Sequence, residues 1–111
     1  MRSFPSLKDK KRYLVFEIIS EKTHSFEEVK TAVFGAVASF LGTSGIAKSK
    51  LKVLADKWNS QKQRGILSAD RKSIEHVKAA LCLSDNVGES SAIIRSIGVS
   101  GIIKKAVKNY Y

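Results

Sequence analysis

Few residues of this sequence stand at spacings that support catalysis. His24 and His76 each lack the nearby His or Cys that a metal site needs. Ser73 and His76 are one helical turn apart, but nothing nearby would orient the imidazole for a nucleophilic serine. Asp56 and Asp70 flank two predicted strands, and Asp70 is explained as a helix cap. We therefore expect no catalytic residues, and no metal or cofactor bound by the protein itself.

Positive charge is the abundant chemistry of the chain. Twenty Lys and Arg stand against ten Asp and Glu, for a net charge of +10. The excess lies in three blocks, 1–12, 48–72 and 101–111, and the segments between them are slightly acidic. Blocks of one sign on a small domain are typical of a surface that binds a polyanion. Nucleic acid is the favoured partner, and an acidic protein surface or a membrane surface is the alternative.

The chain has 111 residues, which predicts one domain with a single core. Its one cysteine, Cys82, excludes an internal disulfide and falls in a helical pattern, where we expect it to be buried. No apolar run approaches the length of a membrane span, and the N-terminus lacks a signal-peptide core. These features predict a soluble, intracellular protein of the cytoplasm.

The stretch from Lys10 to Ser20 predicts a central strand, because three cations lead into a run of Tyr, Leu, Val, Phe and Ile. Alternation places Leu14, Phe16 and Ile18 on one face, and Tyr13, Val15, Glu17 and Ile19 on the other. The first face should be covered by helices. Before this strand, residues 1–9 are expected to form an extended basic arm.

Ser25 and Glu28 have the spacing of a capping box, which predicts a helix from Ser25 to Gly42. Residues 43–50 then read as a glycine-punctuated basic loop whose amides and lysines could meet a phosphate. A strand over 51–58, a polar turn and a strand over 64–69 predict an antiparallel hairpin. Asp70 is expected to cap a second helix that buries Ile74, Val77 and Leu81.

A loop over 84–91 and a strand over 92–99 complete the order β, α, β, β, α, β. Right-handed crossovers then predict an α+β, ferredoxin-like sandwich with a four-stranded antiparallel sheet. Beyond it, residues 102–110 predict a terminal helix with Ile103, Ala106, Val107 and Tyr110 on its apolar edge. We expect that edge to cover the second face of the central strand.

Such a sheet on a basic chain invites comparison with the RNA recognition motif, whose third strand carries aromatic side chains on which bases stack. Here that strand reads RGILSAD and has no aromatic residue. A terminal helix over the sheet would also block this mode. RNA should therefore be contacted through its phosphates and its shape, from the edges and loops.

Several motifs, in order over residues 8–108, resemble one known family. They are KKRYL with Phe16 and Glu17, the segment from Leu41 to Lys48, GI at 65–66 with DR at 70–71, and above all AIIR at 92–95 followed by GVSG at 98–101. The chain is similar to the archaeal ribonuclease P protein component 2 family. Ser68 and Ile102 depart from its pattern, where Arg and Thr are usual.

The resemblance implies a non-catalytic subunit of the ribonucleoprotein that removes the 5′ leader of precursor tRNA, in which the RNA carries an Mg²⁺-dependent cleavage. It implies as partners the ribonuclease P RNA with precursor tRNA, the TIM-barrel-like protein component 3, other ribonuclease P subunits and a homodimer within the complex, with no membrane. The cations that match the family form the expected RNA-facing set: Lys10, Lys11, Arg12, Lys48, Arg71, Arg95, Lys104, Lys105 and Lys108. Arg95 could instead pair with Glu17, and several of the others could contact the protein partner. A stand-alone RNA-binding module and a ferredoxin-like protein-interaction domain are the alternatives.

Overall fold

The computed structural model describes residues 11–111, so Lys10 and the predicted N-terminal arm lie outside the described residues. The elements, in chain order, are β1 (Lys11–Ile19), α2 (Phe26–Ser49), β2 (Lys52–Val53), the 3-10 turn η1 (Ala55–Lys57), β3 (Arg64–Asp70), α3 (Ile74–Leu83), β4 (Asn86–Val87), β5 (Ser90–Ser91), β6 (Ile93–Ser100) and α4 (Ile103–Tyr110). The main sheet has the order β2-β3-β1-β6, with all three pairings antiparallel. This confirms the predicted α+β, ferredoxin-like sandwich.

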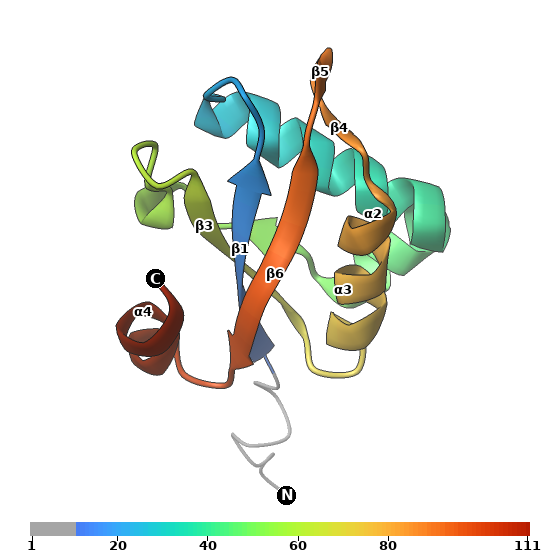
Figure 1. Cartoon of the computed structure of the whole chain (residues 1–111). Coiled ribbons are helices and arrows are strands. Elements are labelled where there is room, and N and C mark those ends of the chain that lie inside the picture. Colours follow the sequence, from blue (N-terminus) through green and yellow to red (C-terminus); the bar gives the residue numbers. More distant parts are fainter. Residues whose placement is uncertain (1–10) are drawn as a thin grey trace, which may run out of the picture.

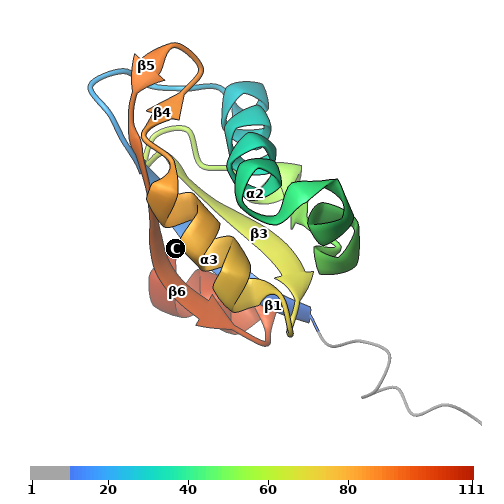
Figure 2. The ribbon, with the colours of Figure 1, turned by 90° about the vertical axis from the view of Figure 1, so that its right-hand side faces the viewer.

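Strand β1 is central, as predicted, and both of its faces are covered. Leu14, Phe16 and Ile18 belong to the main core, which α2 and α3 close from one side of the sheet (Figure 1). Val15 belongs to a second, smaller core with Ile66 and Ala106, on the side where α4 lies (Figures 1 and 2). The apolar residues on both faces of β1 therefore reflect a three-layered molecule, in which the sheet lies between α2 and α3 on one side and α4 on the other.

Helix α4 covers the second sheet face, as expected, but only in part. Ala106 is fully buried there, and Tyr110 packs against the backbone of Gly98, where an added Cβ would lie 2.5 Å from the ring. Ile19, at the far end of β1, stays 44% exposed, so the expectation that α4 covers it is wrong. The reason is length, since α4 has eight residues and spans only about 12 Å.

Helix α2 begins at the predicted capping box, and its first segment ends at Gly42 as predicted, but a second helical segment follows where a loop was expected. The Glu28 amide donates to the Ser25 hydroxyl, and the Ser25 amide donates to the Glu28 carboxylate. Gly42 leaves the helical conformation at φ 77°, and the chain then resumes the helix to Ser49. Ile46 packs against the main core and holds this second segment in place. The predicted flexible loop over 43–50 is therefore wrong.

Two other segments differ from the predicted loops and strands. The strand expected over 51–58 is reduced to two residues, because Leu54 joins the smaller core and the next residues form η1. This turn lets Trp58 stack on Phe16, with 6.4 Å between the ring centroids. The expected loop over 84–91 contains the β4–β5 hairpin, which the fully buried Val87 anchors.

Two predictions around α3 also need correction. Asp70 is the last residue of β3 and accepts a hydrogen bond from the Lys72 amide, while Ser73 occupies the N-cap position. Asp70 therefore closes a turn and does not cap the helix. The predicted buried stripe of α3 is confirmed, but Cys82 is exposed, because it follows Leu81 and is turned by about 100° from the buried face.

Helix α2 corrects the expectation that no segment reaches the length of a membrane span. It has 24 residues and is long and apolar enough to cross a bilayer by length and composition alone. Only 17% of its most apolar stretch is buried inside the protein. Core helices of globular proteins pass the same test, and Val29, Val33 and Val37 are fully buried against the sheet.

Candidate nucleic-acid interface

The antiparallel register gathers several of the predicted RNA-facing cations at one end of the sheet. Lys11 pairs with Asp70, so the start of β1 lies beside Arg71 and Lys72, which follow β3. Tyr13 pairs with Ser100, so the end of β6 reaches the same place, at the bottom of Figure 1. We call this group the basic end and define it as Lys11, Arg12, Lys52, Arg71 and Lys72.

The chain shapes the basic end by local packing. The Arg12 side chain lies against Gly101, where an added Cβ would be 3.3 Å from the guanidinium, and Arg12 donates to the Lys11 carbonyl. Lys52 opens β2 opposite Ser68, which places this lysine at the outer edge of the same end. Lys11, Lys52, Arg71 and Lys72 are exposed. Charge is thus concentrated where three strands and one turn meet.

Helix α4 extends the positive surface beyond the basic end. Lys104, Lys105 and Lys108 are exposed, as predicted, while Ala106 between them is buried. Lys104 and Lys108 line a small hollow of about 260 Å³ together with Lys57 from η1. Lys57 was missed by sequence reasoning, because the alternation over 51–58 was interpreted as a strand and concealed the turn that brings this lysine to α4.

The C-terminal residue fixes the position of η1 next to this hollow. The Tyr111 hydroxyl donates to the Lys57 carbonyl. Burial, together with the nearby charge of Asp56, raises the pKa of Tyr111. The phenol therefore stays protonated and able to donate across the neutral range, and it ties the end of the chain to the turn that carries Lys57.

Arg95 does not lie at the basic end. It pairs with Glu17 across β1 and β6, and its Nη2 is 3.4 Å from Glu17 Oε1. Arg64 holds the other carboxylate oxygen, with Nε 3.1 Å from Glu17 Oε2. The predicted pairing of Arg95 with Glu17 is confirmed, although 59% of the Arg95 side chain remains exposed.

Arg64 is the structural cation that sequence reasoning missed. Besides Glu17, its Nη1 donates to the carbonyls of Tyr110 and Tyr111, at 3.2 Å and 3.3 Å. It therefore connects the sheet to the end of α4. The signal was the lone carboxylate of Glu17 in an otherwise apolar strand, since a half-buried charge in a central strand requires a cation on a neighbouring strand.

Lys48 lies on the last turn of α2, and Lys50 adopts a left-handed conformation as its C-cap. Both side chains are exposed. The expected phosphate-binding loop at this position is wrong, because residues 43–49 are helical and most of their amides serve the helix. Lys48 and Lys50 therefore present exposed, charged side chains just before β2.

The arrangement suits binding of phosphates by side-chain cations. Tyr13 lies half-buried beneath α4, and Ser68, on the same sheet face, is 3% exposed, so residues 11–111 offer bases no open aromatic platform on this face. Within residues 11–111, no group of three or more His, Cys, Asp or Glu side chains gathers in a way that could hold a metal ion. What the described surface offers is positive charge at the basic end and along α4.

Comparison with known proteins assigns the chain to a family. A sequence profile described as the Rpp14/Pop5 family matches residues 12–111. A protein from Thermococcus gammatolerans named ribonuclease P protein component 2 is 38% identical, over 96% of this chain and 87% of the relative. The proteins of that name from Pyrococcus abyssi and Methanosarcina mazei are 38% and 29% identical, over 96% and 98% of this chain and 88% and 90% of the relatives.

The fold has a match among solved structures. A chain in the cryo-EM structure of yeast ribonuclease MRP superposes with a TM-score of 0.66 at 10% identity, covering 97% of this chain and 93% of that one. At this level of identity the match supports the fold alone. The profile and the archaeal relatives together establish the relationship, and this protein belongs to the Rpp14/Pop5 family.

Proposed function

We propose that this protein is a subunit of ribonuclease P that binds the ribonuclease P RNA and supports removal of the 5′ leader from precursor tRNA. The observation that carries the proposal is membership of the Rpp14/Pop5 family over residues 12–111, with archaeal relatives that are named as ribonuclease P subunits. The protein would work in the cytoplasm, without contact with a membrane.

The charges of the described surface support a contact with folded RNA. The basic end and the three lysines of α4 present cations without aromatic stacking positions, which suits phosphates and helical shape better than unpaired bases. In this proposal Lys11, Arg12, Arg71, Lys104, Lys105 and Lys108 contact RNA, and Lys48 lies at the margin. Arg95 contributes only the exposed part of a side chain that already pairs with Glu17.

The chemistry of cleavage would belong to the RNA with its bound Mg²⁺. Cations supplied by the protein lower the repulsion between phosphates, so the RNA would hold its folded, metal-binding form at lower Mg²⁺ concentration. The protein itself would bind no cofactor. Component 3 and other ribonuclease P subunits would complete the assembly, within which this chain would stand as one copy or as a homodimer.

Cleavage of precursor tRNA by the cognate RNA, titrated with Mg²⁺, tests the proposal. Adding this protein together with its partner subunits should lower the Mg²⁺ concentration required for half-maximal cleavage. Replacing Lys104, Lys105 and Lys108 by Ala should raise that requirement several-fold without changing the circular dichroism spectrum, because all three side chains are exposed.

A charge-matched control is available away from α4, on the turn after β1, on α2 and on α3. Lys22, Lys30 and Lys78 are also exposed, and their joint replacement by Ala removes the same net charge. It should leave the Mg²⁺ curve unchanged. Cleavage by the isolated protein would contradict the proposed role. So would an Mg²⁺ requirement that is the same with and without the protein.

A further inference from the structure

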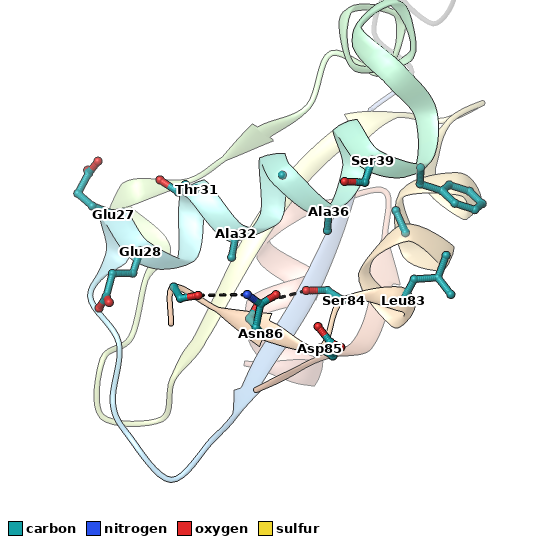
Figure 3. A pocket seen from close by; sticks show the side chains of 14 residues that line it. Glu27, Glu28, Thr31, Ala32, Ala36, Ser39, Leu83, Ser84, Asp85 and Asn86 are labelled. Carbon is teal, nitrogen blue, oxygen red and sulfur yellow. Dashed lines mark hydrogen bonds between the residues drawn. The ribbon is translucent and has the colours of Figure 1, made fainter. Parts of the chain in front are cut away.

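A groove runs between α2 and the segment that joins α3 to β6, far from the α4 face. It has a volume of about 770 Å³, and its lining includes Ala32, Gly35, Ala36 and Ala80. Figure 3 shows Glu27 and Glu28 at one end, Leu83 at the other, and Ala32 and Ala36 between them, facing Asn86. The RNA-binding proposal makes no use of this surface.

Two large apolar side chains of the groove are exposed. Phe40 is 44% exposed and Leu83 is 69% exposed, and both line the groove. Helix α2 is rich in apolar residues, yet only 17% of its most apolar stretch is buried. Exposed apolar surface that is contiguous and rimmed by polar groups is typical of an interaction site.

The charge around the groove is opposite to that of the rest of the protein. Among the residues that the structure describes, its lining contains Glu27, Glu28 and Asp85 and no Lys or Arg, in a chain with a net charge of +10. Hydrogen bonding from the Ser25 amide lowers the pKa of Glu28, which keeps this carboxylate ionised. Acidic side chains repel phosphates, so both RNA and an anionic membrane are disfavoured here.

The small residues on α2 define the shape of the occupant. Ala32, Gly35, Ala36 and Ser39 recur at helical spacing along the groove, and a Cβ built on Gly35 meets no atom within 4 Å. The lining consists mainly of helix side chains, so an extended chain finds no strand edge to extend on α2. Another helix can lie in such a groove, with its apolar side chains inserted and its polar side chains at the rim.

We propose that this groove binds an amphipathic helix of another protein, with apolar side chains seated between Phe40 and Leu83 and with Lys or Arg side chains facing Glu27, Glu28 and Asp85. The inference rests on the proposed function only in making the partner a protein subunit of the same assembly. The molecule then has two separate surfaces, a basic one for RNA and an apolar, acid-rimmed one for protein.

Selection from a displayed library of amphipathic helices tests the proposal on the full chain. Gly35→Trp fills the groove, and Ala38→Trp places the same side chain on an exposed α2 position outside the lining. Helices enriched on the unmodified protein should carry Lys or Arg beside Leu, Ile, Phe or Met. Their affinity should fall at least tenfold with Gly35→Trp and remain unchanged with Ala38→Trp.

A second variant tests the charge. Glu27→Gln with Asp85→Asn should weaken the same helices several-fold at low salt, and the difference should shrink at high salt, because rim charges are screened. Enriched helices that lack basic residues, equal binding to both Trp variants, or failure to enrich any helix would overturn the proposal. So would a dimer of this chain that Gly35→Trp dissociates, because the occupant would then be a second copy.

The same proteins separate this inference from the proposed function. Binding to the ribonuclease P RNA should be equal for the unmodified chain, Gly35→Trp and Ala38→Trp. Helix binding without any RNA binding would refute the RNA role and leave the groove assignment standing. RNA binding that is lost with Gly35→Trp alone would instead place RNA in the groove and overturn the inference.

Discussion

At the scale of single residues, the two arginines that hold Glu17 differ in what they contribute. The Arg64 side chain is 28% exposed and also donates to the backbone oxygens of Tyr110 and Tyr111, while Arg95 is 59% exposed and pairs with the carboxylate. Ion pairs with an exposed partner contribute about 0–1 kcal/mol, and hydrogen bonds from charged groups contribute about 1.5–3 kcal/mol when shielded. Arg64 is therefore the structural residue of the pair.

We expect Arg64→Ala to lower the free energy of unfolding by about 2 kcal/mol, and Arg95→Ala to lower it by less than about 1 kcal/mol. Urea unfolding followed by circular dichroism measures both values. Arg95→Lys should change neither the stability nor the salt dependence of RNA binding by a large amount. A larger loss for Arg95→Ala than for Arg64→Ala would show that the exposed arginine carries the pairing.

Gln63 is a second residue whose importance the sequence conceals. It reads as part of a polar turn, yet it is 9% exposed, and its side chain bonds both backbone groups of His24, accepting from the amide at 2.9 Å and donating to the carbonyl at 3.3 Å. These bonds join the turn that leads into α2 to the turn before β3. Because His24 is 5% exposed, water cannot replace the lost partner easily.

Gln63→Ala should therefore lower the free energy of unfolding by about 1–3 kcal/mol, the cost of leaving a buried amide without a partner. Gln61→Ala is the matched control, since Gln61 is exposed in the same turn and only its backbone amide is bonded, to Asn59. The control should stay within about 0.5 kcal/mol of the unmodified protein. Equal urea midpoints for the two variants would rule out a structural role for the Gln63 side chain.

At the scale of elements, local signals predicted those features that depend on neighbouring residues. The capping box at Ser25 and Glu28 and the alternation in β1 depend on such neighbours, and both are present. The helix beyond Gly42 could not be predicted, because Ile46 holds it through a contact with the distant core. The β4–β5 hairpin in a mostly polar segment could not be predicted for the same reason, because the burial of Val87 in the core stabilises it.

For the candidate site too, the features set by local sequence could be predicted and those set by long-range contacts could not. The cation positions in the sequence predicted that positive surface would flank β1 and cover α4, and the strand register accounts for how Lys11 and Arg71 come together. The roles of Lys57 and Arg64 could not be predicted from the sequence, because a short turn positions Lys57 and a long-range ion pair positions Arg64. The acid-rimmed groove could not be predicted either, because Glu27 and Asp85 are far apart in sequence and only the packing of α2 beside β4 brings them to one surface.

The packing of α4 on the sheet depends on a residue without a side chain. A Cβ at Gly98 would lie 2.5 Å from the Tyr110 ring, so Gly98→Ala should displace α4 and cost about 1–3 kcal/mol. Hydrogen exchange of the amides from Ile103 to Tyr110 should become faster. Gly35→Ala is the control, because its Cβ meets nothing and a helical alanine should add about 0.5–1 kcal/mol. Unchanged exchange in α4 would show that Tyr110 adjusts without leaving the sheet.

At the scale of the whole molecule, charge is divided between two regions. Cations gather where β1 starts and β3 ends and along α4, while the groove beside α2 has an acidic rim. This polarity fits a protein that lies between an RNA and another protein, with each partner attracted to one side and repelled by the other. It also predicts that substitutions on the two sides act independently, since the surfaces share no residue.

The salt dependence of RNA binding tests how localised the basic surface is. If the basic end, the Lys48 region and α4 each neutralise one or two phosphates, the logarithm of the affinity should fall with the logarithm of the salt concentration at a slope of roughly −3 to −5. Replacing Lys11, Arg71 and Lys72 by Ala should reduce the steepness of that slope by about 1–2, because each lost phosphate contact releases about one counterion fewer. Filter binding or fluorescence anisotropy over a range of salt concentrations gives both slopes.

The control variant removes the same charge from three exposed lysines outside the basic end and α4, namely Lys22, Lys30 and Lys78. It should weaken binding slightly through the overall field and leave the slope unchanged, because long-range attraction between distant charges is screened beyond about 10 Å. Equal changes of slope in the two triple variants would mean that net charge alone attracts the RNA and that the basic end is not its contact. A steep slope that only the basic-end variant lowers would place phosphates at the junction of β1, β3 and β6, next to the first turn of α4.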